Sequence, residues 1–436
     1  MIVSADVYLW GSRIGQVLQL RQEEPPVFEY DNNFIRSGIQ VAPFMMPLDR
    51  SVYSFPELMR IESFKGLPGL LADSLPDRFG NVIISEWLTA QGRKEKDFTA
   101  IERLCYTGTR GMGALEFQPS NTPETYNDEI DLNSMVELAS KVLENRRSKI
   151  IDDKAGLRQL ISVGTSAGGA RPKILIAVDK KAGRITSGQI DAGKNAEYWL
   201  LKLDGVTRSG DHGVTDAQQY TRIEYVYYQM AVDAGIEMME CRLLQKDGRS
   251  HFMTRRFDRV NGDKVHVQTL AALKHYDYNI PGLCSYEEYC KTAHDLGLLR
   301  QDMQQIFKRT VFSVLFCNYD DHVKNFSFLM DRQGKWHLSS AYDVTFAYAP
   351  ENQWLGSHQM SINGKRTDIT TDDLLAFGSS IGLSKVFCKK VIAEQVGVAK
   401  RFPDYAAENR LSEQIADEIY RIIRDVNKDI FEKSES

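Results

Sequence analysis

The stretch from Cys317 to Ser327 constrains this chain more than any other part of its sequence. It reads Cys-Asn-Tyr-Asp-Asp-His-Val-Lys-Asn-Phe-Ser, so acidic, amide and basic side chains share one short turn. Apolar residues at helical spacing from Met303 to Leu315 predict a buried helix that ends just before it. Because a rigid helix is a good platform for functional side chains, we expect chemistry rather than packing from this loop.

A further carboxylate follows the loop, since Asp343 stands eighteen residues after Asn325 in an apolar setting. An Asp at 320, an Asn five residues later and an Asp on the next hairpin reproduce the spacing of a protein-kinase catalytic loop with its magnesium-binding Asp. Asp320 would then orient the substrate hydroxyl, and Lys324 would neutralise charge on the transferred phosphoryl group. Asn325 and Asp343 would supply oxygen ligands for Mg²⁺. Asp321 is ambiguous, because one of the two adjacent Asp residues could be only a turn former.

The composition argues against several classes of protein. With 436 residues, 42% apolar and 26% charged, the chain is ordinary globular material for two or three packed cores. A net charge of −5 argues against a stand-alone DNA-binding protein. The six cysteines form no C-x-x-C pair, as expected in a reducing cytoplasm. Without a signal-peptide pattern or an apolar run of about 18 residues, we expect a soluble cytoplasmic protein with no membrane span.

A loop rich in small residues runs from Ser162 to Lys173 and leads into an apolar strand at 174–178. Backbone N–H groups in such a loop can approach phosphate oxygens without interference from Cβ atoms. The sequence fits neither G-x-x-x-x-G-K-[ST] nor G-x-G-x-x-G. Taken alone, the loop is therefore more often a flexible hairpin tip than a phosphate site.

The next strand, Tyr198–Leu203, carries Lys202 in an apolar run. An uncompensated buried ammonium is costly, so an anion must meet it. The helix expected from Thr215 has Glu224 on or beside its apolar stripe. A strand Lys and an inward helix Glu form the pair expected of a kinase, and a solvated Glu at the edge of the stripe is the alternative.

The segment from Phe252 to Arg259 is strand-like and leads to a turn at Asn261-Gly262. A two-lobed kinase has its hinge here, where backbone groups bind adenine and an acidic residue meets the ribose. On the residues alone, Arg255, Arg256, Asp258 and Arg259 are more simply a surface charge cluster.

We expect an α+β fold with an N-terminal mixed α/β lobe and a C-terminal, mainly helical lobe. Residues 1–120 form an α/β subdomain, and a polar, breaker-rich run after Gln118 sets a soft boundary. Residues 121–260 complete the first lobe with the small-residue loop, the strand lysine and the hinge. Residues 261–436 form the helical lobe with the catalytic loop.

These motifs together resemble the HipA family of bacterial serine/threonine kinases, the toxins of toxin–antitoxin pairs, over nearly the whole length. The family's D-G-H-A-K-N-F-S corresponds to Asp320–Ser327, and its Y-D to Tyr342-Asp343. Its S-x-A-G-A-x-x-K loop is similar to Ser166–Lys173, and its hinge F-D-R matches Phe257–Arg259. The resemblance implies a two-lobed, protein-kinase-like (HipA-like) fold.

The resemblance also implies ATP and Mg²⁺ as cofactors, autophosphorylation and self-inactivation at Ser166, and a HipB-like helix-turn-helix antitoxin as partner. DNA would be contacted mainly through that antitoxin, and the substrate would be a translation-related protein of the aminoacyl-tRNA synthetase class. Phe257 would mark the backbone that contacts adenine, and Asp258 would contact the ribose. The implied nucleotide-binding residues are Ser166, Ala167, Gly168, Gly169, Ala170, Lys173, Lys202, Glu224, Phe257, Asp258, His322 and Asn325. Asp320 and Lys324 are the expected catalytic residues, and Asn325 and Asp343 the expected metal ligands.

The chain departs from the family pattern at three places. The family's Gly after the catalytic Asp is Asp321, Arg255 replaces a common acid before the hinge Arg, and the Q-E-D-x-C-Q segment reads Gln-Thr-Leu-Ala-Ala-Leu at 268–273. Two other functions remain open. One is a catalytically silent, antitoxin-binding co-repressor, and the other is a kinase acting on a small-molecule hydroxyl.

Overall fold

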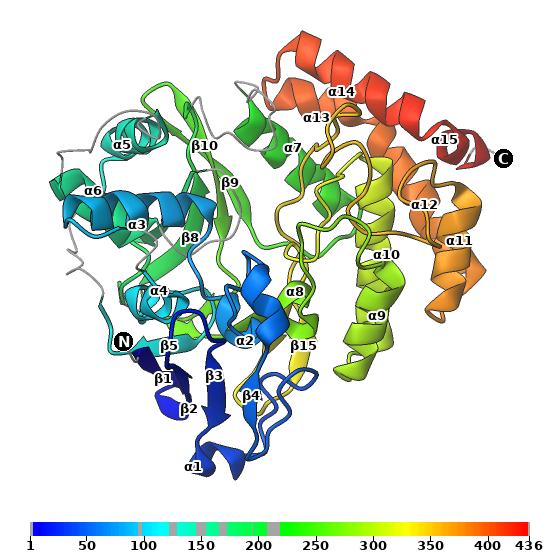
Figure 1. The fold of residues 1–436 in the computed structure, drawn as a ribbon. Coiled ribbons are helices and arrows are strands. Elements are labelled where there is room, and N and C mark those ends of the chain that lie inside the picture. The colour runs from blue at the N-terminus through cyan, green and yellow to red at the C-terminus, as the bar shows by residue number, and fades with distance from the viewer. Residues whose placement is uncertain are drawn as a thin grey trace. The chain divides into compact units, whose positions relative to one another are not determined.

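The computed structural model describes residues 3–94, 98–121, 129–144, 154–164, 172–193, 195–206 and 219–434. The chain divides into two compact units. Unit 1 comprises Met1–Gln218, Leu244–His275 and Leu329–Lys335, and unit 2 comprises Gln219–Leu243, Tyr276–Phe328 and Trp336–Ser436. Unit 1 combines sheets with helices, whereas unit 2 is mainly helical (Figure 1). The predicted α+β class is therefore confirmed.

The first sheet of unit 1 is five-stranded, in the order β4-β3-β2-β1-β5. Its strands are β1 (Val3–Leu9), β2 (Ser12–Gln19), β3 (Val27–Tyr30), β4 (Val52–Ser54) and β5 (Leu115–Gln118). All neighbouring strands pair antiparallel. The alternation of apolar residues over 3–10 and 15–20 predicts two strands joined by a turn at 11–13. Buried residues alternate along β1 and β2 as this predicts, but β2 begins earlier, at Ser12.

The second sheet of unit 1 has the order β7-β6-β8-β10-β9. Its strands are β6 (Lys173–Asp179), β7 (Ile185–Ser187), β8 (Ala196–Lys202), β9 (Cys241–Lys246) and β10 (Arg249–Arg255). Helices α3 (Arg78–Ala90), α5 (Leu132–Glu144) and α6 (Lys154–Val163) cover one face (Figure 1). Ile174, Ile176, Trp199 and Leu201 pack into the core that these helices share with the sheet. Because side chains alternate along a strand, Lys173 and Lys202 belong to the opposite face.

Short elements complete unit 1. They are α1 (Asn32–Ile35), the 3-10 helix η1 (Pro56–Arg60), α2 (Gly69–Ala72), α4 (Ala100–Thr107), α8 (Leu270–Lys274) and the strands β11 (Arg259–Val260), β12 (Asp263–Lys264) and β13 (His266–Thr269). Helix α2 packs against α8, and a Cβ atom on Gly69 would lie 2.0 Å from the carbonyl oxygen of Ala272. Only glycine permits this approach. The N–H of Gly69 also donates to Nε2 of His275 at 2.9 Å.

Unit 2 is built around an aromatic core. Its helices are α7 (Tyr220–Asp233), α9 (Tyr286–Asp295), α10 (Arg300–Leu315), α11 (Thr371–Ser380), α12 (Lys385–Lys400), α13 (Phe402–Glu408), α14 (Glu413–Val426) and α15 (Lys428–Ser434). Helix α10 packs against α9 and α12 (Figure 1). Phe307 stacks on Phe377 with ring centroids 6.0 Å apart, and Tyr289 contacts Phe326 at 4.9 Å. The strands β14 (Ser327–Met330) and β15 (Trp336–Leu338) follow the loop after α10.

The helix predicted from the apolar pattern before Cys317 is α10, and it is buried along its second half as expected. The helix expected after the strand Tyr198–Leu203 corresponds to α7. Its predicted start at Thr215 lies outside the described residues, and the described helix begins at Tyr220. In the described part of the chain, no helix is both long enough and apolar enough to span a membrane.

Candidate active site

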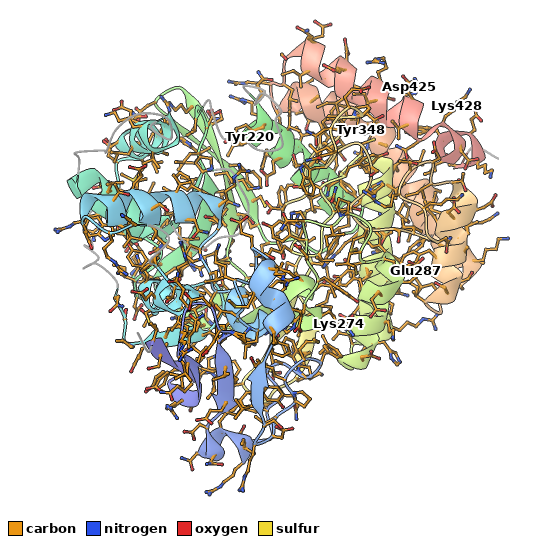
Figure 2. The ribbon with its side chains drawn as sticks, in the orientation of Figure 1. Tyr220, Lys274, Glu287, Tyr348, Asp425 and Lys428 are labelled. Atoms are coloured by element: carbon orange, nitrogen blue, oxygen red, sulfur yellow. The ribbon has the colours of Figure 1, made fainter. Side chains whose placement is uncertain are left out.

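The loop after α10 is held in a defined conformation. Cys317 ends the helix with a left-handed backbone, φ +52°. Its carbonyl accepts from the N–H of Ala347 at 3.1 Å, and the N–H of Tyr319 donates back to the carbonyl of Ala347 at 2.9 Å. The Tyr319 ring packs edge-on against Tyr348, which is labelled in Figure 2, with centroids 5.1 Å apart. The loop is therefore fixed against a segment thirty residues further along the chain.

Asn325 closes the loop onto Asp320. Its side-chain Nδ2 donates to the backbone carbonyl of Asp320 at 2.7 Å, and its N–H donates to the carbonyl of His322 at 2.8 Å. Since the amide nitrogen is used in this way, Oδ1 of Asn325 is the atom left to accept or to ligate. The carboxylate of Asp320 is one-third exposed, with Oδ1 at 3.7 Å from Nε2 of His322.

His322 is a neutral residue at the centre of the loop. Burial lowers the pKa of its imidazole to about 4, Lys324 lowers it further, and the negative charge of Asp343 acts in the opposite direction. Its ring lies 5.4 Å from the ring of Tyr278, and Nζ of Lys324 lies 5.2 Å from the same tyrosine ring. Both side chains therefore lie beside the ring of Tyr278.

The segment that contains Asp343 is tied to the loop through the neighbouring tyrosine. Oη of Tyr342 donates to the carbonyl of Lys324 at 2.7 Å and lies 2.5 Å from Oγ of Ser327. Asp343 itself adopts a left-handed backbone, φ +52°, which is uncommon for a residue other than glycine. Unit 2 therefore brings together the five residues that the sequence places in the loop and beyond the hairpin: Asp320, His322, Lys324, Asn325 and Asp343.

The adjacent carboxylate, Asp321, has a different environment from Asp320. It is completely buried, and its Oδ2 accepts from Oη of Tyr286 at 2.8 Å and lies 2.8 Å from Nδ1 of His358. Its Oδ1 accepts from the N–H of Gln359 at 2.7 Å. These partners stand 35 to 38 residues away in the sequence and carry no local pattern, so sequence reasoning missed them. Asp321 anchors the loop to α9 and to the segment at 358–359.

In unit 1, two lysines lie opposite each other on neighbouring strands. Lys173 of β6 and Lys202 of β8 are cross-strand partners, and Lys202 is also opposite Phe252 of β10. Both lysines are buried, and Nζ of Lys202 lies 5.9 Å from the Phe252 ring. Opposed like charges disfavour a sheet, so this face is suited to an anion. The two predicted phosphate-binding lysines are thus neighbours.

The residues predicted to form a hinge follow directly after β10. Asp258 is fully buried, and its carboxylate accepts from Nε and Nη2 of Arg256 at 2.8 and 2.7 Å and from Nη1 of Arg259 at 2.8 Å. The N–H of Gly113 donates to it at 2.8 Å. The two arginines and the Gly113 N–H hold the pKa of this carboxyl well below its usual range, against the opposing effect of burial. These partners give Asp258 a structural role, and Phe257 beside it is half-buried.

Two further groups of predicted site residues are the small-residue loop and Glu224. Ser166, Ala167, Gly168, Gly169 and Ala170 lie outside the described residues. Glu224 is 3% exposed, so the alternative of a solvated Glu at the edge of α7 is wrong. Its pairing with Lys202 stays a prediction.

The donor set fits a magnesium ion bound together with phosphates. Among the described residues, no three His, Cys, Asp or Glu side chains cluster as a self-sufficient metal site. Mg²⁺ does not need one, because it is usually held by one or two protein oxygens with phosphates and water. Oδ1 of Asn325 and the carboxylate of Asp343 match that requirement.

The mixed α/β unit and the mainly helical unit define a two-lobed, protein-kinase-like α+β protein. A chain of the solved Shewanella oneidensis MR-1 toxin–antitoxin complex of HipA, HipB and its operator DNA has the same fold. The match covers 99% of this chain and 96% of that chain, with a TM-score of 0.65 and 16% identity.

The chain belongs to the HipA family. Residues 5–118 match the HipA N-terminal domain, and residues 165–402 match the HipA-like C-terminal domain. Among curated proteins, it is 26% identical over 228 residues to "Putative kinase Y4dM" of Sinorhizobium fredii (strain NBRC 101917 / NGR234). That alignment covers 48% of this chain and 51% of the relative, so the chain matches about half the length of that protein.

Proposed function

We propose that this protein is a Mg²⁺- and ATP-dependent protein serine/threonine kinase of the HipA toxin type. The observation that carries the proposal is the loop after α10, in which Nδ2 of Asn325 is bonded to the backbone of Asp320. This bond uses the amide nitrogen of Asn325 and leaves its Oδ1 as the atom that would bind Mg²⁺. It also fixes the backbone that carries the Asp320 carboxylate.

Asp320, Lys324 and Asn325 are the loop residues with proposed roles in phosphoryl transfer. Asp320 accepts a hydrogen bond from the acceptor hydroxyl and orients its oxygen toward the γ-phosphorus. Lys324, held near Tyr278, faces the charge that develops on the phosphoryl oxygens. His322 stays neutral at physiological pH because its pKa is about 4, so it adds no charge beside Asp320.

Asn325 and Asp343 would hold Mg²⁺, which when bound neutralises charge on the nucleotide phosphates. Lys173 and Lys202 would bind phosphate oxygens, because both ammonium groups arise from the same sheet face. The small-residue loop from Ser166 to Ala170 would cover the phosphates, with Ser166 as the site of autophosphorylation. Glu224 would pair with Lys202, and the backbone near Phe257 would contact adenine.

The proposal extends to partners by family membership. A HipB-like helix-turn-helix antitoxin would bind this chain and carry the DNA contact, since the net charge of −5 does not favour direct binding to DNA. The substrate would be a translation-related protein of the aminoacyl-tRNA synthetase class. A cytoplasmic location follows from that substrate.

The test compares lysate treated with active enzyme and Mg-ATP with lysate treated with an Asp320→Asn variant. Phosphopeptides and phosphorylated metabolites are profiled in parallel. We expect new phosphoserine or phosphothreonine in a small number of proteins. New phosphometabolites without phosphopeptides would show that the acceptor is a small molecule. If neither kind of product forms, the silent co-repressor is the function that remains.

A further inference from the structure

One buried histidine, His358, contacts both sequence neighbours of Asp320. Its ring lies against the ring of Tyr319, with centroids 4.0 Å apart at an interplanar angle of 43°. The residue after Asp320 is contacted as well, because Nδ1 of His358 lies 2.8 Å from Oδ2 of Asp321. His358, Tyr319 and Asp321 are all buried. The residues before and after Asp320 are therefore held by the same side chain.

The hydrogen bond between His358 and Asp321 has a defined direction. Oη of Tyr286 donates to Oδ2 of Asp321 at 2.8 Å, and the N–H of Gln359 donates to Oδ1 at 2.7 Å. Since this carboxylate accepts from both of these groups, Nδ1 of His358 is the atom that carries the hydrogen in the third contact. Hydrogen bonds to a carboxylate are stronger than those between neutral groups. The bond is therefore suited to fixing the position of Asp321.

The backbone that carries His358 is itself fixed. Its N–H donates to the carbonyl of Arg366 at 3.0 Å, and its carbonyl accepts from Nε of Arg366 at 2.6 Å. Nη2 of the same arginine donates to Oγ of Ser357 at 2.6 Å. Three residues after His358, the N–H of Ser361 donates to the carbonyl of Cys284 at 3.2 Å. A side chain on a backbone held in this way can keep a neighbouring loop in place.

The position of Asp320 has to be set through its backbone, because its carboxylate must reach an acceptor hydroxyl. The side chain is one-third exposed. Its backbone carbonyl accepts from Nδ2 of Asn325 at 2.7 Å, and the N–H of Tyr319 donates to the carbonyl of Ala347 at 2.9 Å. The two contacts of His358 add a restraint on each side of Asp320 and leave the carboxylate accessible.

We propose that His358 is a positioning residue for phosphoryl transfer. Its hydrogen bond to Asp321 and its contact with Tyr319 hold the backbone of Asp320 where the carboxylate meets the acceptor hydroxyl. The inference rests on the proposed function, in which Asp320 orients that hydroxyl. Misplacement of a reacting group by about 1 Å can lower a rate by about a hundredfold, so the loss of His358 acts on the transfer step.

The test measures the rate of label transfer from γ-labelled ATP to the phosphatase-treated protein at saturating Mg-ATP. Calorimetric titration gives the affinity for Mg-ATP. His358→Leu keeps an apolar contact for Tyr319 but has no hydrogen to donate to Asp321. We expect its transfer rate to fall by about tenfold or more, with an affinity for Mg-ATP within about twofold of the wild type. His358→Asn restores an N–H donor and should recover most of the rate.

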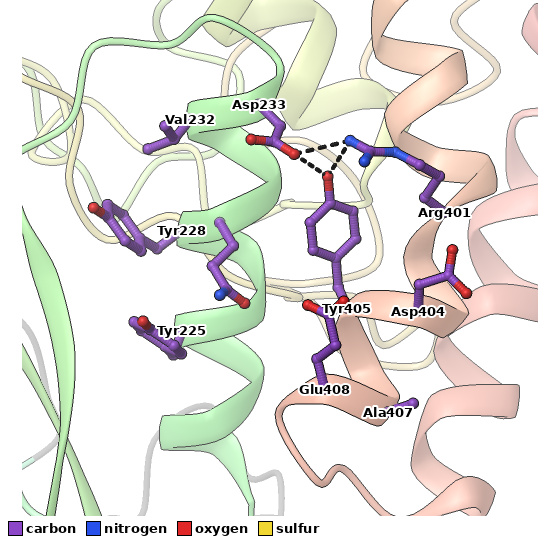
Figure 3. A pocket seen from close by; sticks show the side chains of 10 residues that line it. Tyr225, Tyr228, Val232, Asp233, Arg401, Asp404, Tyr405, Ala407 and Glu408 are labelled. Atoms are coloured by element: carbon purple, nitrogen blue, oxygen red, sulfur yellow. Dashed lines mark hydrogen bonds and ion pairs between the residues drawn. The ribbon is translucent and has the colours of Figure 1, made fainter.

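Two tyrosine variants separate positioning from general stability. Tyr286→Phe removes a hydroxyl donor from Asp321 and should also lower the transfer rate. Tyr405→Phe is the matched control, because it removes the hydroxyl donor from Asp233 in the pocket between α7 and α13 (Figure 3). The residues that line this pocket include none from the loop Cys317–Ser327. The control should therefore transfer label at the wild-type rate, even if its urea midpoint falls.

The outcomes distinguish this inference from the proposed function. A wild-type protein that transfers no phosphate would overturn the proposed function and the role of His358 with it. An active wild type with an equally active His358→Leu variant would overturn the positioning role alone. The same conclusion holds if His358→Asn is as slow as His358→Leu, because the hydrogen bond to Asp321 is then not the link. If His358→Leu does not fold, Tyr286→Phe decides, and a rate equal to that of Tyr405→Phe would contradict the proposal.

Discussion

Nδ1 of His358 lies 2.8 Å from Oδ2 of Asp321, and both side chains are at most 2% exposed. This contact joins the catalytic-loop candidate to a segment 37 residues further along the chain. It distinguishes the roles of the two adjacent carboxylates, because Asp321 anchors the loop whereas Asp320 remains accessible to solvent. The family has Gly at the position of Asp321, so the anchor is a feature of this chain.

Replacement of Asp321 by Ala is expected to destabilise the protein. It leaves three buried donors, from Tyr286, His358 and Gln359, without their acceptor, at a cost of about 3 kcal/mol. Urea denaturation measures the change, with Asp417→Ala on the exposed face of α14 as control. An unchanged midpoint for Asp321→Ala would show that the network does not hold the loop.

Replacement of Lys202 by Met should weaken ATP binding by about tenfold or more, because a charge-assisted hydrogen bond contributes about 1.5–3 kcal/mol. Calorimetric titration with Mg-ATP measures the affinity. Lys181→Met removes an exposed lysine that follows β6 and should bind ATP normally. Equal affinities of the Lys202 and Lys181 variants for ATP would show that the sheet face that carries Lys202 does not bind the phosphates.

Asp258→Asn is expected to lower the free energy of unfolding by about 3–5 kcal/mol, since it leaves Arg256 and Arg259 buried without their counter-charge. The urea midpoint is the measurement. If the variant instead keeps full stability but binds ATP more weakly, contact with the ribose would be the main role of Asp258.

The stability of the protein should fall between pH 7 and pH 5, in part through His275. Burial lowers the pKa of His275 to about 4, below its ordinary value near 6.5, so the unfolded chain binds the proton more readily. Stability from this group is therefore present above pH 6.5 and is lost as pH falls toward 4. At pH 5 the loss is about 2 kcal/mol relative to pH 7.

Protonation would also remove the acceptor of the Gly69 N–H, which gives the effect a structural cause. A His275→Asn variant should be less stable at pH 7 but should lose less stability on going to pH 5. The exposed His294→Asn variant is the control and should keep the wild-type difference. Equal pH dependence of the wild type and the His275 variant would contradict the assignment.

Much of the architecture could be predicted because it depends on local patterns in the sequence. The meander of β1 and β2, the buried helix α10 and the loop after it follow from periodicity and turn residues. The burial of Glu224 could not be decided in this way, because a residue at the edge of a stripe can face either side. The cross-strand pairing of Lys173 with Lys202 depends on register, which a single strand does not reveal.

The environment of Asp321 and Asp258 was the hardest to predict, for the same reason. The partners of Asp321 lie 35 to 38 residues away in the sequence. Asp258 is bonded to the neighbouring Arg256 and Arg259 and also to the backbone N–H of Gly113, which has no side-chain signature. A sequence motif does not show whether its polar residues face solvent or take part in a buried hydrogen-bond network. From the structure, we expect Asp321→Gly to remove the anchor of the loop.

The central claim is that Asp320 directs phosphoryl transfer. The most direct measurement incubates phosphatase-treated, purified protein with Mg²⁺ and γ-labelled ATP, and locates the label by mass spectrometry. We predict label on Ser166 for the wild type and for the exposed Asp417→Asn control, and none for Asp320→Asn with unchanged folding and ATP binding. Label on the Asp320→Asn protein at the wild-type rate, or no label on the wild type or on any lysate protein, would contradict the account.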